Sequence, residues 1–257
     1  MISIRHIRTI FTVALIATCN IATPPIALCK PDPSMNQTAS KNYRAIMEDA
    51  LSGTVCSANL KVIVEACERS DSVLDKKALD NGKGAAAASI TRQVLSLTDR
   101  ETKKIIDFAG AADTDPEDRA RALYHFGRLM RTLQDFYFCS NYLELQIEDT
   151  NPANLDPYKI EPINWSRISR DPHEIATLGF EYGGIDKTSA SEPEGAKTSG
   201  RATYFSMAKE LALKETQRQW NTIERLIRIR YPQKATEISL AMKKSSCPAD
   251  FKPGAVP

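Results

Sequence analysis

Apolar residues recur at intervals of three and four along most of the chain, which predicts helices rather than strands. The clearest stretch begins at Thr114-Asp-Pro-Glu117, a typical helix start with proline near the first helical position, and runs to about Leu145. No alternation of apolar and polar residues is long enough to indicate a strand. Five large apolar residues follow at helical spacing, and we expect them to form one buried stripe: Leu123, Phe126, Met130, Leu133 and Tyr137.

The same spacing predicts several helices before this one. A short amphipathic helix is expected over 41–51 and a longer one over 57–79, with a break at Asn81-Gly-Lys-Gly84. A further helical stretch opens at Ala85. Within it, Thr98-Asp-Arg-Glu101 has the spacing of a capping box, so we expect a fresh helix to begin there.

The second half of the chain divides into an irregular region and two helices. Residues 150–200 are rich in proline, glycine and serine, and a long loop of this kind is usually functional or disordered. A long helix is expected over 200–230, ended by Pro232, and a short one over 234–244. The sequence therefore predicts an all-α, single-domain multi-helix bundle with a long irregular loop region.

The N-terminus has the pattern of an export signal. Arg5 and Arg8 precede the apolar run Ile10–Ile21, which is too short to span a bilayer. Polar residues inside the run weaken the alternative of a membrane anchor, and the residues before Cys19 and Cys29 fit a lipoprotein signal poorly. We expect a secreted or periplasmic protein with no transmembrane segment in the mature chain. The expected organisation is a signal peptide over 1–29, a disordered lead-in over 30–40, a helical domain over 41–246 and a C-terminal tail over 247–257.

Cysteine usage agrees with an oxidising compartment. Four cysteines lie well beyond the signal, and four cysteines allow three pairings. We expect Cys56–Cys67, because the two are close in sequence, and Cys139–Cys247, which would tie the tail to the central helix.

Composition narrows the possible partners. Of the 257 residues, 42% are hydrophobic, which is enough for a sizeable core, and the net charge of +2 gives no electrostatic case for nucleic acid. One basic run could touch an anionic lipid or peptidoglycan, although we favour a solvated helix face. The run consists of Arg225, Arg228, Arg230, Lys234, Lys243 and Lys244.

One segment is specific enough to indicate a family. Thr132-Leu-Gln-Asp-Phe-Tyr137 is followed by Ser140-Asn141 and Glu144. This segment resembles the metal-site helix of the Het-C family, which reads His-Thr-Leu-Gln-Asp-Phe-Tyr-x-His-Ser-Asn-Trp-x-Glu and is related to the zinc-dependent phospholipase C and P1 nuclease superfamily. The resemblance implies an all-helical fold of that type with a metal cleft between helices. Weaker similarities extend it over about residues 85–220: Ile90-Thr91-Arg92, Gly184-Ile-Asp-Lys187 and Ala208-Lys-Glu-Leu-Ala212.

The histidines that the resemblance implies are missing. In the family motif, His and Asp at i and i+4 lie on one helix face and can present ligands to zinc, which activates water against a phosphoester. The chain has three histidines in total, and Arg131 and Cys139 stand where the motif has its two. We interpret this as loss of the metal site. Arg131 lies four residues before Asp135 and can pair with it in place of zinc, which would turn the cleft into a structural polar core.

Two function classes follow from the resemblance. The first is a non-catalytic Het-C-like pseudoenzyme that uses no cofactor and binds an unknown protein partner or small ligand in the degenerate cleft. The alternative is a zinc-dependent phosphoester hydrolase whose reduced metal site uses Asp135 with His125 and His173. For both histidines we favour a packed, capping or surface role. The candidate cleft residues are Arg131, Asp135, Glu144, His125 and His173.

Overall fold

The computed structural model describes residues 33–70, 85–148, 156–168 and 185–248, together with Asp171, His173, Ile175, 178–179, 181–182 and Phe251. The expected signal peptide, the expected break at residues 81–84 and most of the expected C-terminal tail lie outside the described residues.

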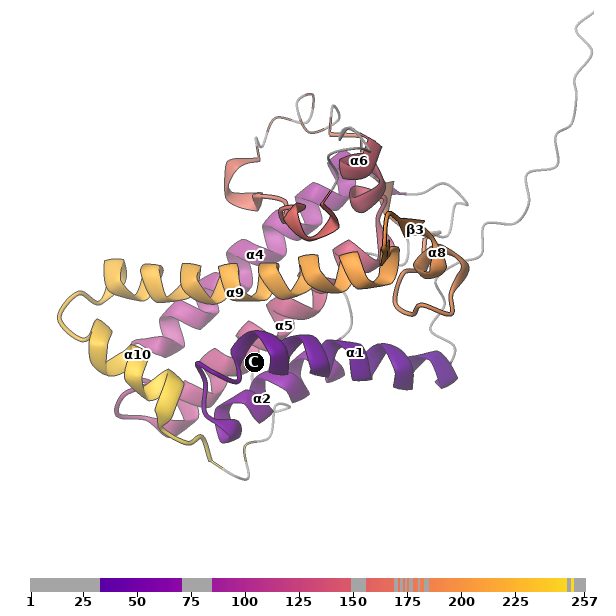
Figure 1. The fold of residues 1–257 in the computed structure, drawn as a ribbon. Helices are drawn as coiled ribbons and strands as arrows, with labels where there is room; N and C mark the ends of the chain where they lie inside the picture. Colours follow the sequence, from indigo (N-terminus) through magenta and orange to yellow (C-terminus); the bar gives the residue numbers. More distant parts are fainter. Residues whose placement is uncertain are drawn as a thin grey trace, which may run out of the picture.

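Within these ranges the chain is mostly helical, and the predicted all-α fold is confirmed (Figure 1). Two antiparallel ladders of two residues each are the strands of the described part, β1 (Ala85–Ala86) with β2 (Glu181–Tyr182) and β3 (Thr198–Ser199) with β4 (Ala202–Thr203). The irregular region holds the short 3-10 turns η2 (Pro157–Lys159) and η3 (Trp165–Arg167). The helices are α1 (Pro33–Leu51), α2 (Ser57–Arg69), α4 (Ala87–Ala109), α5 (Pro116–Cys139), α6 (Tyr142–Glu148), α8 (Pro193–Ala196), α9 (Tyr204–Arg230) and α10 (Ala235–Lys244).

Helix α5 is the central element of the bundle. It packs against α2, α4, α9 and α10, and α9 crosses in front of α4 and α5 in Figure 1. Because neighbours surround α5, its predicted apolar stripe is fully buried, and Phe126 meets Trp220 of α9 edge-on at 5.2 Å. Burying each such side chain contributes roughly 1.5–3 kcal/mol to folding. The predicted stripe is confirmed.

The start of α5 agrees with the sequence, and its end does not. Asp115 caps the helix by accepting hydrogen bonds from the backbone amides of Glu117 and Asp118, and Pro116 occupies the first turn. The helix ends at Cys139 rather than near Leu145. Ser140 has an extended backbone that bridges to Tyr182, so the ladder interrupts the helix before α6 begins.

Two other predicted boundaries differ from the structure. Helix α4 runs without a break through Thr98, so the fresh helix start predicted there is wrong. The packing of α4 against both α5 and α9 outweighs the local capping signal. Helix α1 begins at Pro33, so the backbone over 33–40 is helical where a disordered lead-in was expected.

Gly127 allows α2 and α5 to approach closely. A Cβ atom at this position would lie 2.3 Å from the backbone oxygen of Ile63 and 2.7 Å from the Cβ of Ala66. No side chain fits there without moving α2, so glycine is a structural requirement of this crossing.

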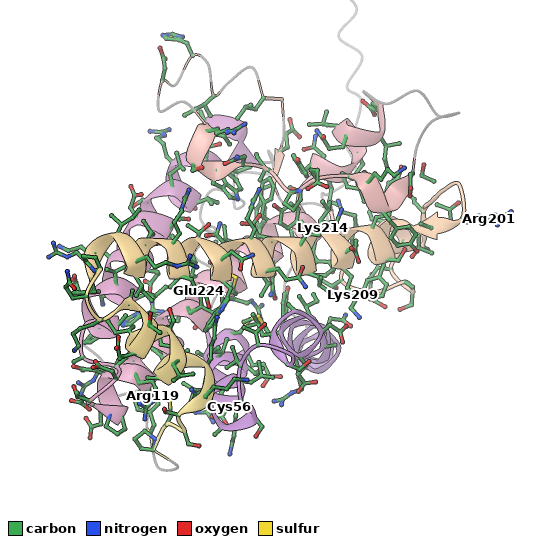
Figure 2. All side chains as sticks on the ribbon, turned by 60° about the vertical axis from the view of Figure 1, so that its left-hand side comes forward. Cys56, Arg119, Arg201, Lys209, Lys214 and Glu224 are labelled. Carbon is green, nitrogen blue, oxygen red and sulfur yellow. The ribbon has the colours of Figure 1, made fainter. Side chains whose placement is uncertain are left out.

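The four cysteines expected to form disulfides are free, and that prediction is wrong. Cys56 and Cys67 lie at opposite ends of α2, about 16 Å apart along the helix axis, whereas a disulfide needs Cα atoms within about 7 Å. Cys139 ends α5, while Cys247 lies near Arg119 and Cys56 at the other end of the bundle (Figure 2). Burial raises the pKa of Cys247 to about 11.

None of the described helices has a stretch that is long and apolar enough to cross a membrane.

Candidate functional site

The predicted pair of Arg131 and Asp135 is present in the structure. The Nε atom of Arg131 donates a hydrogen bond to Oδ2 of Asp135 over 3.1 Å, and the guanidinium carbon lies 4.1 Å from the ring centre of Tyr43 on α1. The hydroxyl of Tyr43 donates to Oδ1 of the same carboxylate. The three side chains join α5 to α1 around one buried charge pair.

The electrostatics of this cluster stabilise its present charge state. Burial lowers the pKa of Arg131, but the charge of Asp135, its hydrogen bond and the nearby Tyr43 and Cys67 together outweigh burial, and the net pKa of Arg131 is raised. Burial and the neighbouring carboxylate raise the pKa of Tyr43 well above its ordinary value. The phenol therefore stays protonated and remains a donor to Asp135.

Glu144 belongs to a different cluster beyond the end of α5. The Nζ atom of Lys187 lies 3.0 Å from each carboxylate oxygen of Glu144 and also donates to the backbone oxygen of Ser140. Lys187 is fully buried, and burial lowers its pKa in spite of the charge of Glu144. Nearby, Asn141 exchanges hydrogen bonds with the backbone of Glu181. Asn141 and Glu144 thus hold Glu181 and Lys187 against the end of α5.

His125 lies on the side of α5 that packs against α4. Its Nδ1 atom is 2.7 Å from Glu101 of α4, and its ring stacks on Phe108 at 5.6 Å. The imidazole is fully buried, and its Nε2 atom has no hydrogen-bond partner in the described part of the chain. Burial raises the pKa of Glu101, but hydrogen bonds from His125 and Arg100 and the charge of Arg128 bring its net pKa below 4.5.

His173 belongs to a turn on the surface. Its side chain is exposed, and its backbone amide donates to the carboxylate of Asp171 over 2.8 Å, which is the geometry of a turn start. The structure therefore divides the five candidate residues among separate places: Arg131 with Asp135, Glu144 with Lys187, His125 with Glu101, and His173 on the surface.

A buried polar network between α5 and α9 was missed in the sequence analysis. Tyr137 donates to Oε2 of Glu215 over 2.7 Å, and Gln219 donates to Oε1 over 2.7 Å. Arg218 pairs with the same carboxylate. Burial raises the pKa of Glu215 although Arg218 opposes the shift. The signal in the sequence was a glutamate with polar neighbours at i+3 and i+4 on a helix, which is too common to be diagnostic.

The candidate residues do not fit the zinc site of the alternative hypothesis. Both oxygens of Asp135 already hold hydrogen bonds from Arg131 and Tyr43, and His125 faces Glu101 on another side of α5. Among the described residues, no three His, Cys, Asp or Glu side chains are placed to hold a metal ion. A tetrahedral zinc site needs at least three such ligands within about 2.3 Å of one point.

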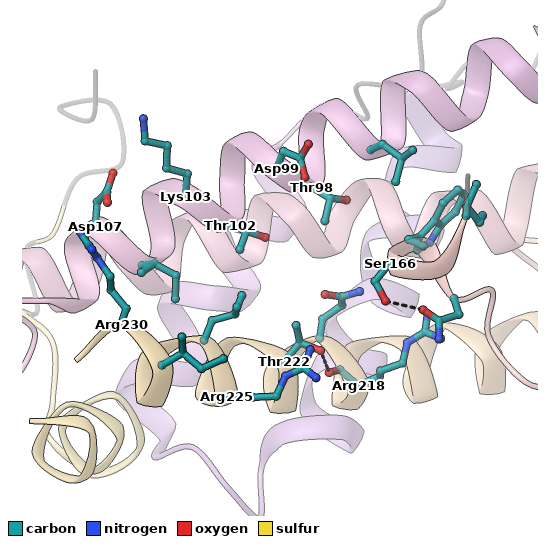
Figure 3. Close-up of a pocket in the computed structure, with 18 residues that line it drawn as sticks. Thr98, Asp99, Thr102, Lys103, Asp107, Ser166, Arg218, Thr222, Arg225 and Arg230 are labelled. Carbon is teal, nitrogen blue, oxygen red and sulfur yellow. Dashed lines mark hydrogen bonds between the residues drawn. The ribbon is translucent and has the colours of Figure 1, made fainter. Parts of the chain in front are cut away.

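A groove lies elsewhere, between α4 and α9, with a volume of about 820 Å³. Figure 3 shows Thr98, Asp99, Thr102 and Lys103 along the α4 wall, facing Arg218, Thr222 and Arg225 of α9. η3 and Ile168 close one end. None of the five candidate residues lines this groove.

The walls of the groove combine apolar residues with polar groups that have no hydrogen-bond or ion-pair partner in the described part of the chain. The hydroxyl of Thr98 is buried without a hydrogen-bond partner, and no ion pair of Lys103 or Arg225 occurs among the described residues. The apolar part of the lining comes from Leu95, Ile106, Trp165, Ile168, Leu226 and Ile229. A ligand could therefore find both apolar contact and free donors in one place.

Comparison of the chain with protein-family models, with curated proteins and with solved structures finds no match. The resemblance to the Het-C family therefore stays a prediction that depends on the residues of α5 and the shorter similarities around it.

Proposed function

We propose that this protein is an exported, non-catalytic, Het-C-like helical protein that binds a small ligand in the groove between α4 and α9. The observation that carries the proposal is the environment of Asp135. Tyr43 and Arg131 each donate to one of its oxygens, and the residue is 4% exposed. A general base or metal ligand must reach the reacting group, and this carboxylate is instead packed into the contact between α1 and α5.

The groove supports binding at a place other than the cleft that the resemblance implies. Its volume is within the range of about 300–1,000 Å³ that is typical of small-molecule sites. Thr98, Lys103 and Arg225 offer polar groups that the described fold does not use. The proposal therefore keeps the binding function expected from the sequence and moves it to a different pair of helices.

Export is supported by the basic and apolar pattern of residues 1–29, which lie outside the described part. N-terminal sequencing of the protein recovered from the medium or periplasm tests it. A mature chain that begins between residues 22 and 30 is expected, whereas a chain that retains Arg5 would contradict export through a cleaved signal.

Catalysis is tested with the purified mature protein. Zinc content is measured after dialysis, and hydrolysis of a phosphodiester and of a phospholipid is measured with zinc added. We expect less than stoichiometric zinc and no hydrolysis above the rate of a heat-denatured sample.

The matched control is Asp135→Asn, which keeps the shape of the side chain and removes its charge. Circular dichroism shows whether this variant is folded. Stoichiometric zinc, or hydrolysis that the folded Asp135→Asn protein has lost, would overturn the proposal in favour of a zinc-dependent hydrolase.

A further inference from the structure

The groove continues into a second hollow whose lining is strongly basic. This hollow has a volume of about 670 Å³ and shares Asn164, Ser166, Arg218, Thr222 and Arg225 with the groove. Because of the shared residues, the two hollows form one channel along α9. Its basic end also contains Arg167 and Lys214.

The basic side chains at this end differ in whether other residues of the protein already bind them. Lys214 donates to the backbone oxygens of Tyr158 and Ile160, and Arg218 is paired with Glu215. Arg167 and Arg225 are exposed, and no ion pair of either occurs among the described residues. Two arginines at one end of a groove are therefore available for an anion from outside the chain.

The other end of the channel combines apolar residues with the charged side chains of Lys103, Asp107 and Arg230 (Figure 3). Ile229 of α9 is 70% exposed, and Leu226 and Ile106 lie beside it in the lining. Arg218 and Ile229 are 11 positions apart on α9, so the channel follows the helix for about 16 Å at 1.5 Å per residue. Thr222, Arg225 and Ile229 follow Arg218 at steps of four, three and four, so they share one face of the helix.

The acidic residues of the lining restrict where an anion can lie. Asp99 and Asp107 are both on the α4 wall (Figure 3), and Glu161 at the basic end lies 3.5 Å from the Nζ atom of Lys214. An anionic group would be repelled from that wall and attracted to Arg167 and Arg225, whereas an apolar chain gains from covering Ile229. Arg225 and Ile229 thus offer an anion-binding group and apolar surface about one helical turn apart in the same channel.

We infer that the channel binds a single-chain anionic amphiphile, with the headgroup at Arg167 and Arg225 and the apolar chain along Leu226 and Ile229. This inference rests on the proposed function, because it names the ligand class of the same groove. The headgroup chemistry, a carboxylate or phosphate carried by one apolar chain, is shared by a free amphiphile and by a lipid in a membrane. The channel favours the free molecule, because its apolar residues come from two facing helices, with Ile106 on α4 and Leu226 and Ile229 on α9, and a groove of this kind fits one chain.

The test is isothermal titration calorimetry of the mature protein with three probes of equal chain length, each below its micelle concentration. The probes are dodecyl phosphate, dodecyl maltoside and dodecyltrimethylammonium. We expect one molecule of dodecyl phosphate to bind, at least about tenfold more tightly than the neutral probe, because only the anionic headgroup can form charge-assisted contacts with Arg167 and Arg225. Binding should also change the fluorescence of Trp165, which lines the groove.

Four variants test the two ends of the channel. Arg225→Gln is expected to weaken dodecyl phosphate binding about tenfold, and Ile229→Asn roughly threefold or more. The controls are Arg228→Gln, on the same helix but paired with Glu224, and Leu240→Asn, exposed on α10. Neither control residue lines the channel, and both variants should bind as the wild type does.

Each other outcome overturns the inference. Equal affinity for the neutral and anionic probes would show that the arginines do not contribute to binding. Equal affinity for inorganic phosphate and dodecyl phosphate would show that the apolar chain does not contribute. A further outcome is that the protein binds vesicles only when they contain phosphatidylglycerol, with binding unchanged in both Arg225→Gln and Ile229→Asn. That result would show that the basic surface binds membranes. A protein that hydrolyses phosphoesters contradicts the proposed function instead, so the two failures are distinguishable.

Discussion

Arg131 and Asp135 lie one turn apart on α5, and the guanidinium Nε of Arg131 donates to Asp135 over 3.1 Å while its guanidinium carbon lies 4.1 Å from the ring centre of Tyr43. In the Het-C-like motif the position of Arg131 belongs to a histidine. A permanently charged guanidinium in that place compensates the carboxylate without any metal. The pair therefore balances the charge of the Asp135 carboxylate within the protein itself.

Replacing Arg131 with methionine should destabilise the protein strongly. The Arg131 side chain is 20% exposed and that of Asp135 is 6% exposed, so the variant leaves a nearly buried carboxylate without its partner. We expect the free energy of unfolding to fall by about 3 kcal/mol, measured by urea denaturation at pH 7.

The control is Arg44→Met, which removes an ion pair with Glu68 from a surface where Arg44 is 46% exposed. Its cost should stay below about 1 kcal/mol. In the double variant Arg131→Met/Asp135→Leu the charge is removed as well, and most of the lost stability should return. An Arg131→Met protein as stable as Arg44→Met would contradict the structural role of the pair.

Glu101 and Glu215 should affect acid stability in opposite directions. The pKa of Glu101 is lowered below 4.5 in the folded protein. The unfolded chain therefore binds more protons than the folded protein in the pH window below 4.5. The stability that the ionised Glu101 contributes is lost as pH falls through this window. The pKa of Glu215 is raised above 4.5 in the folded protein, so the folded protein binds more protons than the unfolded chain in the pH window above 4.5. The free energy of unfolding therefore decreases as pH rises through this window.

Urea unfolding of the wild type, Glu101→Gln and Glu215→Gln at a series of pH values measures both effects. The stability advantage of the wild type over Glu101→Gln should shrink as pH falls below 4.5. The wild type should lose stability relative to Glu215→Gln as pH rises above 4.5. Parallel pH profiles for all three proteins would show that neither carboxyl group has a shifted pKa.

Substituting Gly127 with alanine should destabilise the protein even though alanine is the better helix former. The added methyl group would lie 2.3 Å from a backbone oxygen of α2, and overpacking of this kind costs roughly 1–3 kcal/mol. Gly53→Ala is the control, because no atom lies within 4 Å of its Cβ position. Thermal unfolding should show a lower Tm for Gly127→Ala than for Gly53→Ala, and an equal or higher Tm would indicate that α2 can shift without cost.

Features that depend on neighbouring residues along the chain were predicted well. Asp115 and Pro116 begin α5 as expected, because a cap needs only the first turn of its own helix. The same local reasoning failed at Thr98, where the capping box lies inside a continuous helix that is packed on two sides. It also failed at Ser140, because the bridge that ends α5 comes from Tyr182, which is far away in sequence.

The sequence by itself determined the helical class, the buried stripe of α5 and the pairing of Arg131 with Asp135, because all three depend on residues three or four positions apart on one helix. The tertiary structure alone decided that Tyr43 covers this pair, that Lys187 neutralises Glu144 and that His125 meets Glu101. It also decided against the expected disulfides and formed the groove between α4 and α9. These relationships join residues on different elements, and their distances depend on how the helices pack, which helical periodicity does not encode.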